Sequence, residues 1–130
     1  MIQTTLVLGK SALDREQTIA SELANTVAAN VCQPPQKTAI LLEGLGSGKM
    51  LLEEKDNLIV VRIAAGCLCC SNNMIMRIYL NRLIQQKPQR LYLSLSTDTH
   101  LEQIKQFLTA PSYENILELT KVLNLNPIMT

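Results

Sequence analysis

Three of the four cysteines in this chain of 130 residues lie within four consecutive positions, as Cys67, Cys69 and Cys70 in the stretch Gly-Cys-Leu-Cys-Cys. Three thiolates this close in sequence can converge on one soft or borderline ion, such as zinc or Cu(I). Because zinc prefers four tetrahedral ligands, a fourth place would stay open for His100, a water molecule or a partner protein. The cysteines are therefore candidate metal ligands.

Two other interpretations of the cysteine cluster stay open. Reduced cysteines are often buried as small hydrophobic residues, in which case the thiols would be inert. The cluster could instead be redox-reactive, because it lies near the predicted start of a helix, whose positive end favours the thiolate. The spacing favours metal binding over both. For His100, the alternative is a solvated side chain in the first turn of a helix.

The composition restricts the class of protein. The length fits a single domain over residues 1–130, and a formal net charge of +1 argues against a nucleic-acid binder. No apolar run approaches the roughly 20 residues that cross a bilayer, and we find no signal peptide, so we expect a cytoplasmic protein without a membrane partner. Thiols stay reduced in the cytosol, which favours metal binding over disulfides. A protein partner and a homo-oligomer both stay open.

Short apolar runs alternate with stretches of helical periodicity. The apolar runs predict strands at 4–8, 38–42, 58–63 and 91–95. Helices are expected after the first strand, over 72–86, and after the capping box Thr99-His-Leu-Glu102. Ser11 or Asp14 could cap the first helix. Beyond residue 113 the pattern fits either a helix or a fifth strand over 120–123.

Strands that alternate with helices predict an α/β fold with right-handed crossovers and a mostly parallel sheet covered on both faces. Ligands of such sheets bind at the carboxyl ends of the strands. Gly9, the cysteine cluster and His100 each follow a predicted strand, so we expect them at one edge of the sheet. Cys32 precedes the second strand and is expected at the opposite edge, away from the metal site.

The order of these pieces resembles the CobW-like P-loop GTPases, which act as metal chaperones or cofactor-insertion proteins. Members of that family carry Gly-Cys-x-Cys-Cys after a strand, and Gly66-Cys67-Leu68-Cys69-Cys70 matches this motif. The resemblance covers nearly the whole chain but only the front part of a family member. It implies a P-loop NTPase-like three-layer α/β/α sandwich and a metal-binding role for the three cysteines.

The Walker A loop of such a GTPase is only vestigial in this sequence. The pattern G-x-x-x-x-G-K-[ST] cradles phosphate with backbone N–H groups, and its lysine reaches the β- and γ-phosphates. Placing Gly9 at the first glycine puts Asp14 at the second, Arg15 at the lysine and Glu16 at the hydroxyl that holds Mg²⁺. The carboxylates of Asp14 and Glu16 would repel phosphate. The plain alternative for these three residues is a charged first helical turn.

A second glycine-rich stretch at 44–50 also departs from the Walker A pattern, and no Asn-Lys-x-Asp motif for reading guanine occurs. The sequence therefore predicts a catalytically inactive, CobW-like domain that binds zinc or a similar ion and no nucleotide. Such a domain would act as a metal-binding or protein-interaction module. Two alternatives stay open: a nucleotide-binding GTPase or metallochaperone with an atypical P-loop, and a structural interaction domain with inert thiols.

Overall fold

The computed structural model describes residues 2–9, 12–29, 37–43, 57–63, 74–95 and 101–125. These ranges contain five strands and three helices. In chain order they are β1 (Ile2–Leu8), α1 (Ala12–Ala29), β2 (Thr38–Glu43), β3 (Leu58–Ile63), α2 (Met74–Gln85), β4 (Arg90–Leu95), α3 (Leu101–Leu108) and β5 (Leu117–Asn124).

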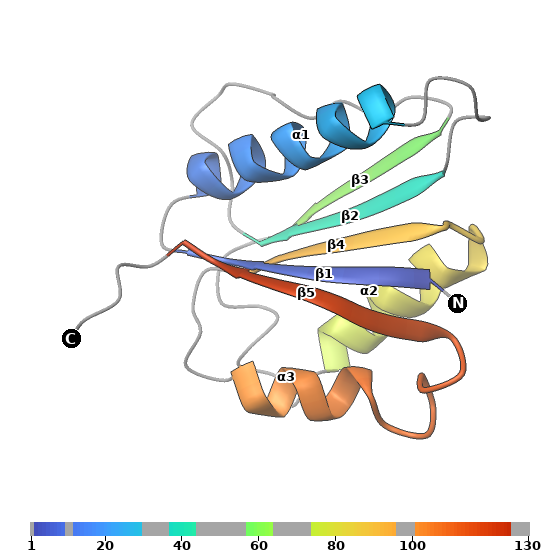
Figure 1. The fold of residues 1–130 in the computed structure, drawn as a ribbon. Coiled ribbons are helices and arrows are strands. Elements are labelled where there is room, and N and C mark those ends of the chain that lie inside the picture. Colours follow the sequence, from blue (N-terminus) through green and yellow to red (C-terminus); the bar gives the residue numbers. More distant parts are fainter. Residues whose placement is uncertain are drawn as a thin grey trace.

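The five strands form one parallel sheet in the order β3-β2-β4-β1-β5. Helix α1 covers one face of this sheet, and helices α2 and α3 cover the other (Figure 1). The predicted α/β class is confirmed, and the arrangement is consistent with the P-loop NTPase-like sandwich that the resemblance implies. Among the described helices, none combines the length and the apolar composition that crossing a bilayer requires.

Alternation along the central strands divides the core between the two faces. In β4, Leu91, Leu93 and Leu95 pack in the cluster that includes α2 and α3, whereas Tyr92 packs in the cluster that includes Ile19 of α1. Every residue of β2 is likewise buried. Because a parallel sheet is covered on both faces, its inner strands read as nearly continuous apolar runs.

Strands β1 and β4 lie side by side at the centre of the sheet. The chain leaves β1 through α1 toward β2, and it leaves β4 through α3 toward β5, so the two connections run to opposite sides. In open α/β sheets, the crevice beyond the carboxyl ends of two such strands is the usual ligand site. The residues that follow β1 and end β4 therefore occupy the position where a ligand would be expected.

Two local predictions need correction or completion. Helix α1 begins at Ala12, so Asp14 lies inside its first turn and does not cap it. In the ambiguous tail, residues 109–116 form turns and the following segment is β5, which pairs with β1 along its length. This segment forms a strand because Leu117 is buried in the core, and because β5 provides hydrogen-bond partners for the backbone groups along the edge of β1.

The packing of β4 predicts the cost of a cavity at its centre. Leu93 is 0% exposed, and Leu93→Ala should lower the free energy of unfolding by about 2–5 kcal/mol, because the lost contacts leave a void. Urea denaturation followed by circular dichroism measures this change. The control is Ile78→Ala on α2, where the side chain is 46% exposed and the change should stay within about 0.5 kcal/mol. Equal losses in the two variants would contradict the central position of β4.

Candidate functional site

The first turns of α1 carry two charged side chains into the interior of the protein. Arg15 and Glu16 are each only 1% exposed. Charged residues are almost never fully buried unless they are paired. These two residues stand where the Walker A pattern requires its lysine and its hydroxyl, so their partners decide what this edge of the sheet can bind.

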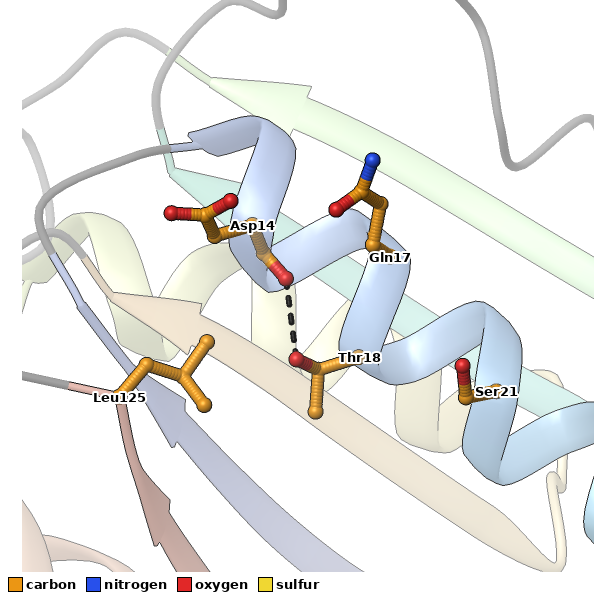
Figure 2. A pocket seen from close by; sticks show the side chains of 5 residues that line it. All are labelled: Asp14, Gln17, Thr18, Ser21 and Leu125. Carbon is orange, nitrogen blue, oxygen red and sulfur yellow. Dashed lines mark hydrogen bonds between the residues drawn. The ribbon is translucent and has the colours of Figure 1, made fainter.

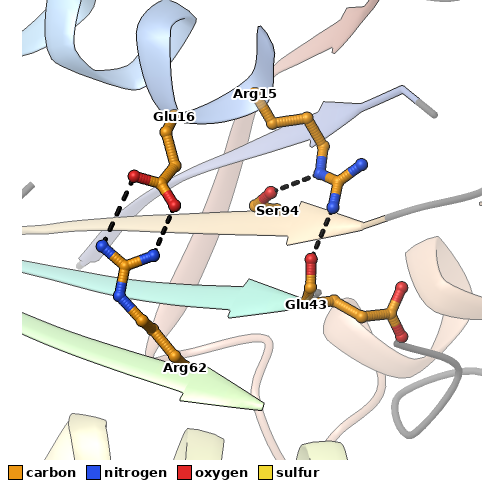
Figure 3. Close-up of polar contacts among 5 residues, drawn as sticks. All are labelled: Arg15, Glu16, Glu43, Arg62 and Ser94. Atoms are coloured by element: carbon orange, nitrogen blue, oxygen red, sulfur yellow. Dashed lines mark hydrogen bonds and ion pairs between the residues drawn. The ribbon is translucent and has the colours of Figure 1, made fainter. Parts of the chain in front are cut away.

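The guanidinium of Arg15 lies at the carboxyl ends of three strands. Its Nε donates a hydrogen bond of 2.6 Å to Oγ of Ser94 in β4, and a second nitrogen donates to the carbonyl oxygen of Glu43, the last residue of β2 (Figure 3). The third nitrogen donates to the carbonyl oxygen of Gly9, directly after β1. Because β2, β4 and β1 are neighbours, one side chain bridges the centre of the sheet.

The strand register explains why polar partners lie under α1. Ser94 pairs with Val7 of β1 and with Leu42 of β2, and Leu42 pairs in turn with Arg62 of β3. These four residues form one row across the sheet on the face that α1 covers. Ser94 and Arg62 are the polar members of that row, and they meet Arg15 and Glu16 respectively.

Glu16 forms a two-pronged ion pair with Arg62. One guanidinium nitrogen of Arg62 donates to Oε1 of Glu16, and the other lies 3.4 Å from Oε2 (Figure 3). Pairing of a guanidinium with both oxygens of a carboxylate is geometrically specific and stronger than a neutral hydrogen bond. Through this pair, α1 is tied to β3.

The electrostatics of Arg15 are those of a buried, compensated cation. Burial lowers the pKa of the Arg15 guanidinium, while the nearby carboxylates of Glu43 and Glu16 act in the opposite direction. An arginine nevertheless stays protonated in proteins. In the part of the chain that the structure describes, every buried side-chain nitrogen or oxygen atom has a hydrogen-bond partner. The interior charge is thus fully satisfied by protein groups.

Gly9 and Asp14, aligned from the sequence with the two glycines of a Walker A pattern, have other surroundings. A Cβ on Gly9 would come within 3.1 Å of Cβ of Leu125, so close packing against the end of β5 accounts for glycine here. Asp14 is exposed, and its backbone carbonyl accepts a 3.0 Å hydrogen bond from the hydroxyl of Thr18. Its side chain lines an open groove of about 370 Å³ with Gln17, Thr18, Ser21 and Leu125 (Figure 2).

The predicted metal ligands lie outside the described residues. These are Cys67, Cys69, Cys70 and His100, and the same holds for Cys32 and the stretch 44–50. Within the described ranges, no group of three or more His, Cys, Asp or Glu side chains is placed to hold a metal ion. The motif is flanked by described elements, since β3 ends at Ile63 and α2 begins at Met74. The cysteine site stays a prediction from the sequence.

The partners that make this edge a connected polar site were not predicted from the sequence. Arg62 and Ser94 are each the second-last residue of a strand that is otherwise rich in apolar side chains. A charged or hydroxyl side chain at such a position is the signal that could have found them, because a buried polar group needs an internal partner. Asp14 fits the alternative of a charged, exposed helical turn, but Arg15 and Glu16 do not.

A double-mutant cycle tests the pair formed by Glu16 and Arg62. Glu16→Ala and Arg62→Ala should each destabilise the protein, and the coupling energy between them should be about 1–3 kcal/mol, because the carboxylate is buried. Urea denaturation of the wild type, both single variants and the double variant gives this value. The control cycle uses Glu102 and Lys105, an exposed pair 3.8 Å apart, for which about 0.5 kcal/mol or less is expected. Equal couplings in the two cycles would refute the buried pair.

Comparisons with known proteins give one informative similarity. No protein-family model matches the chain, and no solved structure gives a significant match. Among curated proteins, the zinc chaperone YeiR of Escherichia coli (strain K12) is 31% identical over 128 residues. The match covers 95% of this chain and 37% of YeiR, so the chain spans little more than a third of that relative's length. Nearly the whole chain is therefore similar to one part of a zinc chaperone.

Proposed function

We propose that this chain is a CobW-like domain that binds zinc, or a similar ion, through Cys67, Cys69 and Cys70 and does not hydrolyse GTP. The similarity to a zinc chaperone and the Gly-Cys-x-Cys-Cys motif support the metal-binding part. His100 is the candidate for the fourth ligand. A module of this kind would act in the cytoplasm, where thiols stay reduced, and would exchange its ion with a protein partner.

The contacts of Arg15 are the observation that carries the inactive part of the proposal. In a P-loop NTPase, the lysine at this position reaches the phosphates, and the neighbouring hydroxyl holds Mg²⁺. Here the guanidinium of Arg15 is turned toward Gly9, Glu43 and Ser94, and the carboxylate of Glu16 is engaged by Arg62. The two side chains at the positions that act in phosphoryl transfer are instead paired with groups of the protein.

The backbone around the vestigial loop supports the same conclusion. A phosphate cradle needs an open turn whose N–H groups point at the anion. Strand β1 ends at Leu8 and α1 begins at Ala12, so the position of the second Walker A glycine, Asp14, is already helical. The N–H of Gly9 is directed to the carbonyl oxygen of Leu95 over 3.2 Å.

The topology supports a metal site at the carboxyl edge. Ile63 pairs with Glu43, so β3 ends at the same edge of the sheet as β2. Cys67, the first cysteine of the motif, stands four residues after Ile63 in the sequence. Three thiolates and one further ligand make a tetrahedral zinc site, and binding must displace protons from the thiols.

Zinc competition is the direct test of the metal site. The wild type should withdraw zinc from a chromophoric chelator, and affinity should weaken as the pH falls because protons compete for the thiolates. Cys67→Ser and Cys69→Ser should each cost more than about tenfold in affinity, since loss of even an outer-shell partner costs roughly 10–100-fold. Cys70→Ser should cost as much if all three thiolates bind.

Cys32→Ser is the matched control for the zinc titration, because this cysteine precedes β2 and is expected at the opposite edge. Its affinity should equal that of the wild type. His100→Ala should lower the affinity only if the imidazole fills the fourth position. If the wild type and Cys67→Ser compete equally well with the chelator, the cysteines are not a metal site and inert thiols become the better interpretation.

Isothermal titration with GTP and Mg²⁺ tests the absence of nucleotide binding. The wild type should give no binding heat at micromolar protein, because Arg15 and Glu16 are already paired inside the fold. A far-UV spectrum and a cooperative thermal transition serve as the control that the sample is folded. A dissociation constant in the low micromolar range would refute the inactive site and favour an atypical GTPase.

A further inference from the structure

The carboxyl ends of β1, β2 and β4 present oxygen acceptors to the space that the Arg15 guanidinium fills. These acceptors are the carbonyl oxygens of Gly9 and Glu43 and the hydroxyl oxygen of Ser94. Phosphate sites at strand-to-helix turns are built the other way, from backbone N–H donors and a helix N-terminus. The groups gathered around this space therefore suit a cation and not an anion.

The charged groups around this space also favour a cation. Glu43, at the end of β2, is 0% exposed, and Glu16 reaches the interior from α1. Both carboxylates stabilise the protonated guanidinium of Arg15 against the cost of its burial. Among the described residues near this edge, Arg62 is a second cation, and it is directed to Glu16. An anion placed among these groups would meet acceptors and negative charge.

We propose that these strand ends form an internal cation site, that the Arg15 guanidinium is its resident ligand, and that this ligand holds the edge together in place of a nucleotide. The guanidinium joins the end of β1 through Gly9. It also joins β2 and β4, and the adjacent Glu16–Arg62 pair joins β3 (Figure 3). The first turns of α1 thus fasten four adjacent strands. This inference involves no cysteine, so it stands or falls independently of zinc binding.

An ion that replaces the Arg15 side chain must match its size and its arrangement of hydrogen-bond donors. Arg15→Ala keeps Cβ and removes the atoms of an ethylguanidinium ion, which makes that ion the matching probe. A guanidinium offers a planar fork of donors, whereas an ammonium offers a point charge. Ethylguanidinium should therefore rebind in the vacated space, ethylammonium should do so poorly, and pyrophosphate should not bind.

Thermal unfolding of the full chain, followed by circular dichroism, is the test. Arg15→Ala should lower Tm by on the order of 10 °C, since a buried ionic network loses its centre. Millimolar ethylguanidinium should restore at least half of that loss with saturation, and equal concentrations of ethylammonium or pyrophosphate should not. The wild type and Lys105→Ala, a change on the surface of α3, should show no rise with any of the three additives.

Two results with Arg15→Ala would overturn the proposal: a variant as stable as the wild type, or one that pyrophosphate stabilises and ethylguanidinium does not. If that variant fails to fold, Ser94→Ala decides, because it removes one acceptor and keeps the cation. It should lower Tm by several degrees more than Ser21→Ala, the matched change on the exposed face of α1. Equal effects of the two serine changes would overturn it as well. A failure of zinc binding in the wild type would leave each of these readouts unchanged.

Discussion

Burial of the Arg15 guanidinium is the constraint around which this sheet edge is arranged. Removing an ion from water costs several kcal/mol unless its donors find acceptors and its charge finds partners. Gly9, Glu43 and Ser94 provide the acceptors, and the carboxylates of Glu43 and Glu16 provide the charge. These groups come from three strands and one helix, so they are brought together only if the sheet order and the position of α1 are both correct.

The consequence for binding follows from the same contacts. In a P-loop, the lysine and the hydroxyl stay accessible to phosphate and Mg²⁺, and ligand binding offsets the energetic cost of leaving them without protein partners. In this chain the corresponding side chains are 1% exposed and engaged by the protein. The carboxyl edge at β1 and β4 is stabilised by contacts within the protein. Under the proposed function, the cysteine motif that follows β3 in the sequence provides the metal ligands.

This division suggests how the chain relates to its curated relative. The similarity to the zinc chaperone YeiR extends over 95% of the chain, but it covers only 37% of YeiR. Under the proposed function, the thiol cluster binds the metal, and ion pairs within the protein occupy the edge of the sheet where a P-loop would bind a nucleotide. Metal binding and nucleotide binding would then be separable properties of this α/β fold.

The sequence by itself determined the elements and the class of fold. The β-branched run at 58–63 is a strand with those bounds, and the alternation of strands with helices led directly to a parallel sheet. It also located Gly9 at the carboxyl edge, because that follows from chain direction alone. These properties depend on residues close together in the chain, whose periodicity is visible without a structure.

The tertiary structure alone decided the order of the strands, the assignment of the tail to β5 and the burial of Arg15 and Glu16. The partners of Arg15 and Glu16 lie up to 79 positions away in sequence, at Ser94, with Arg62 at 46 positions and Glu43 at 28. A local pattern marks such residues as a charged helical turn, since charge usually means exposure. Only the packing of α1 over one row of the sheet places acceptors and countercharges beneath them, and that is why they are buried.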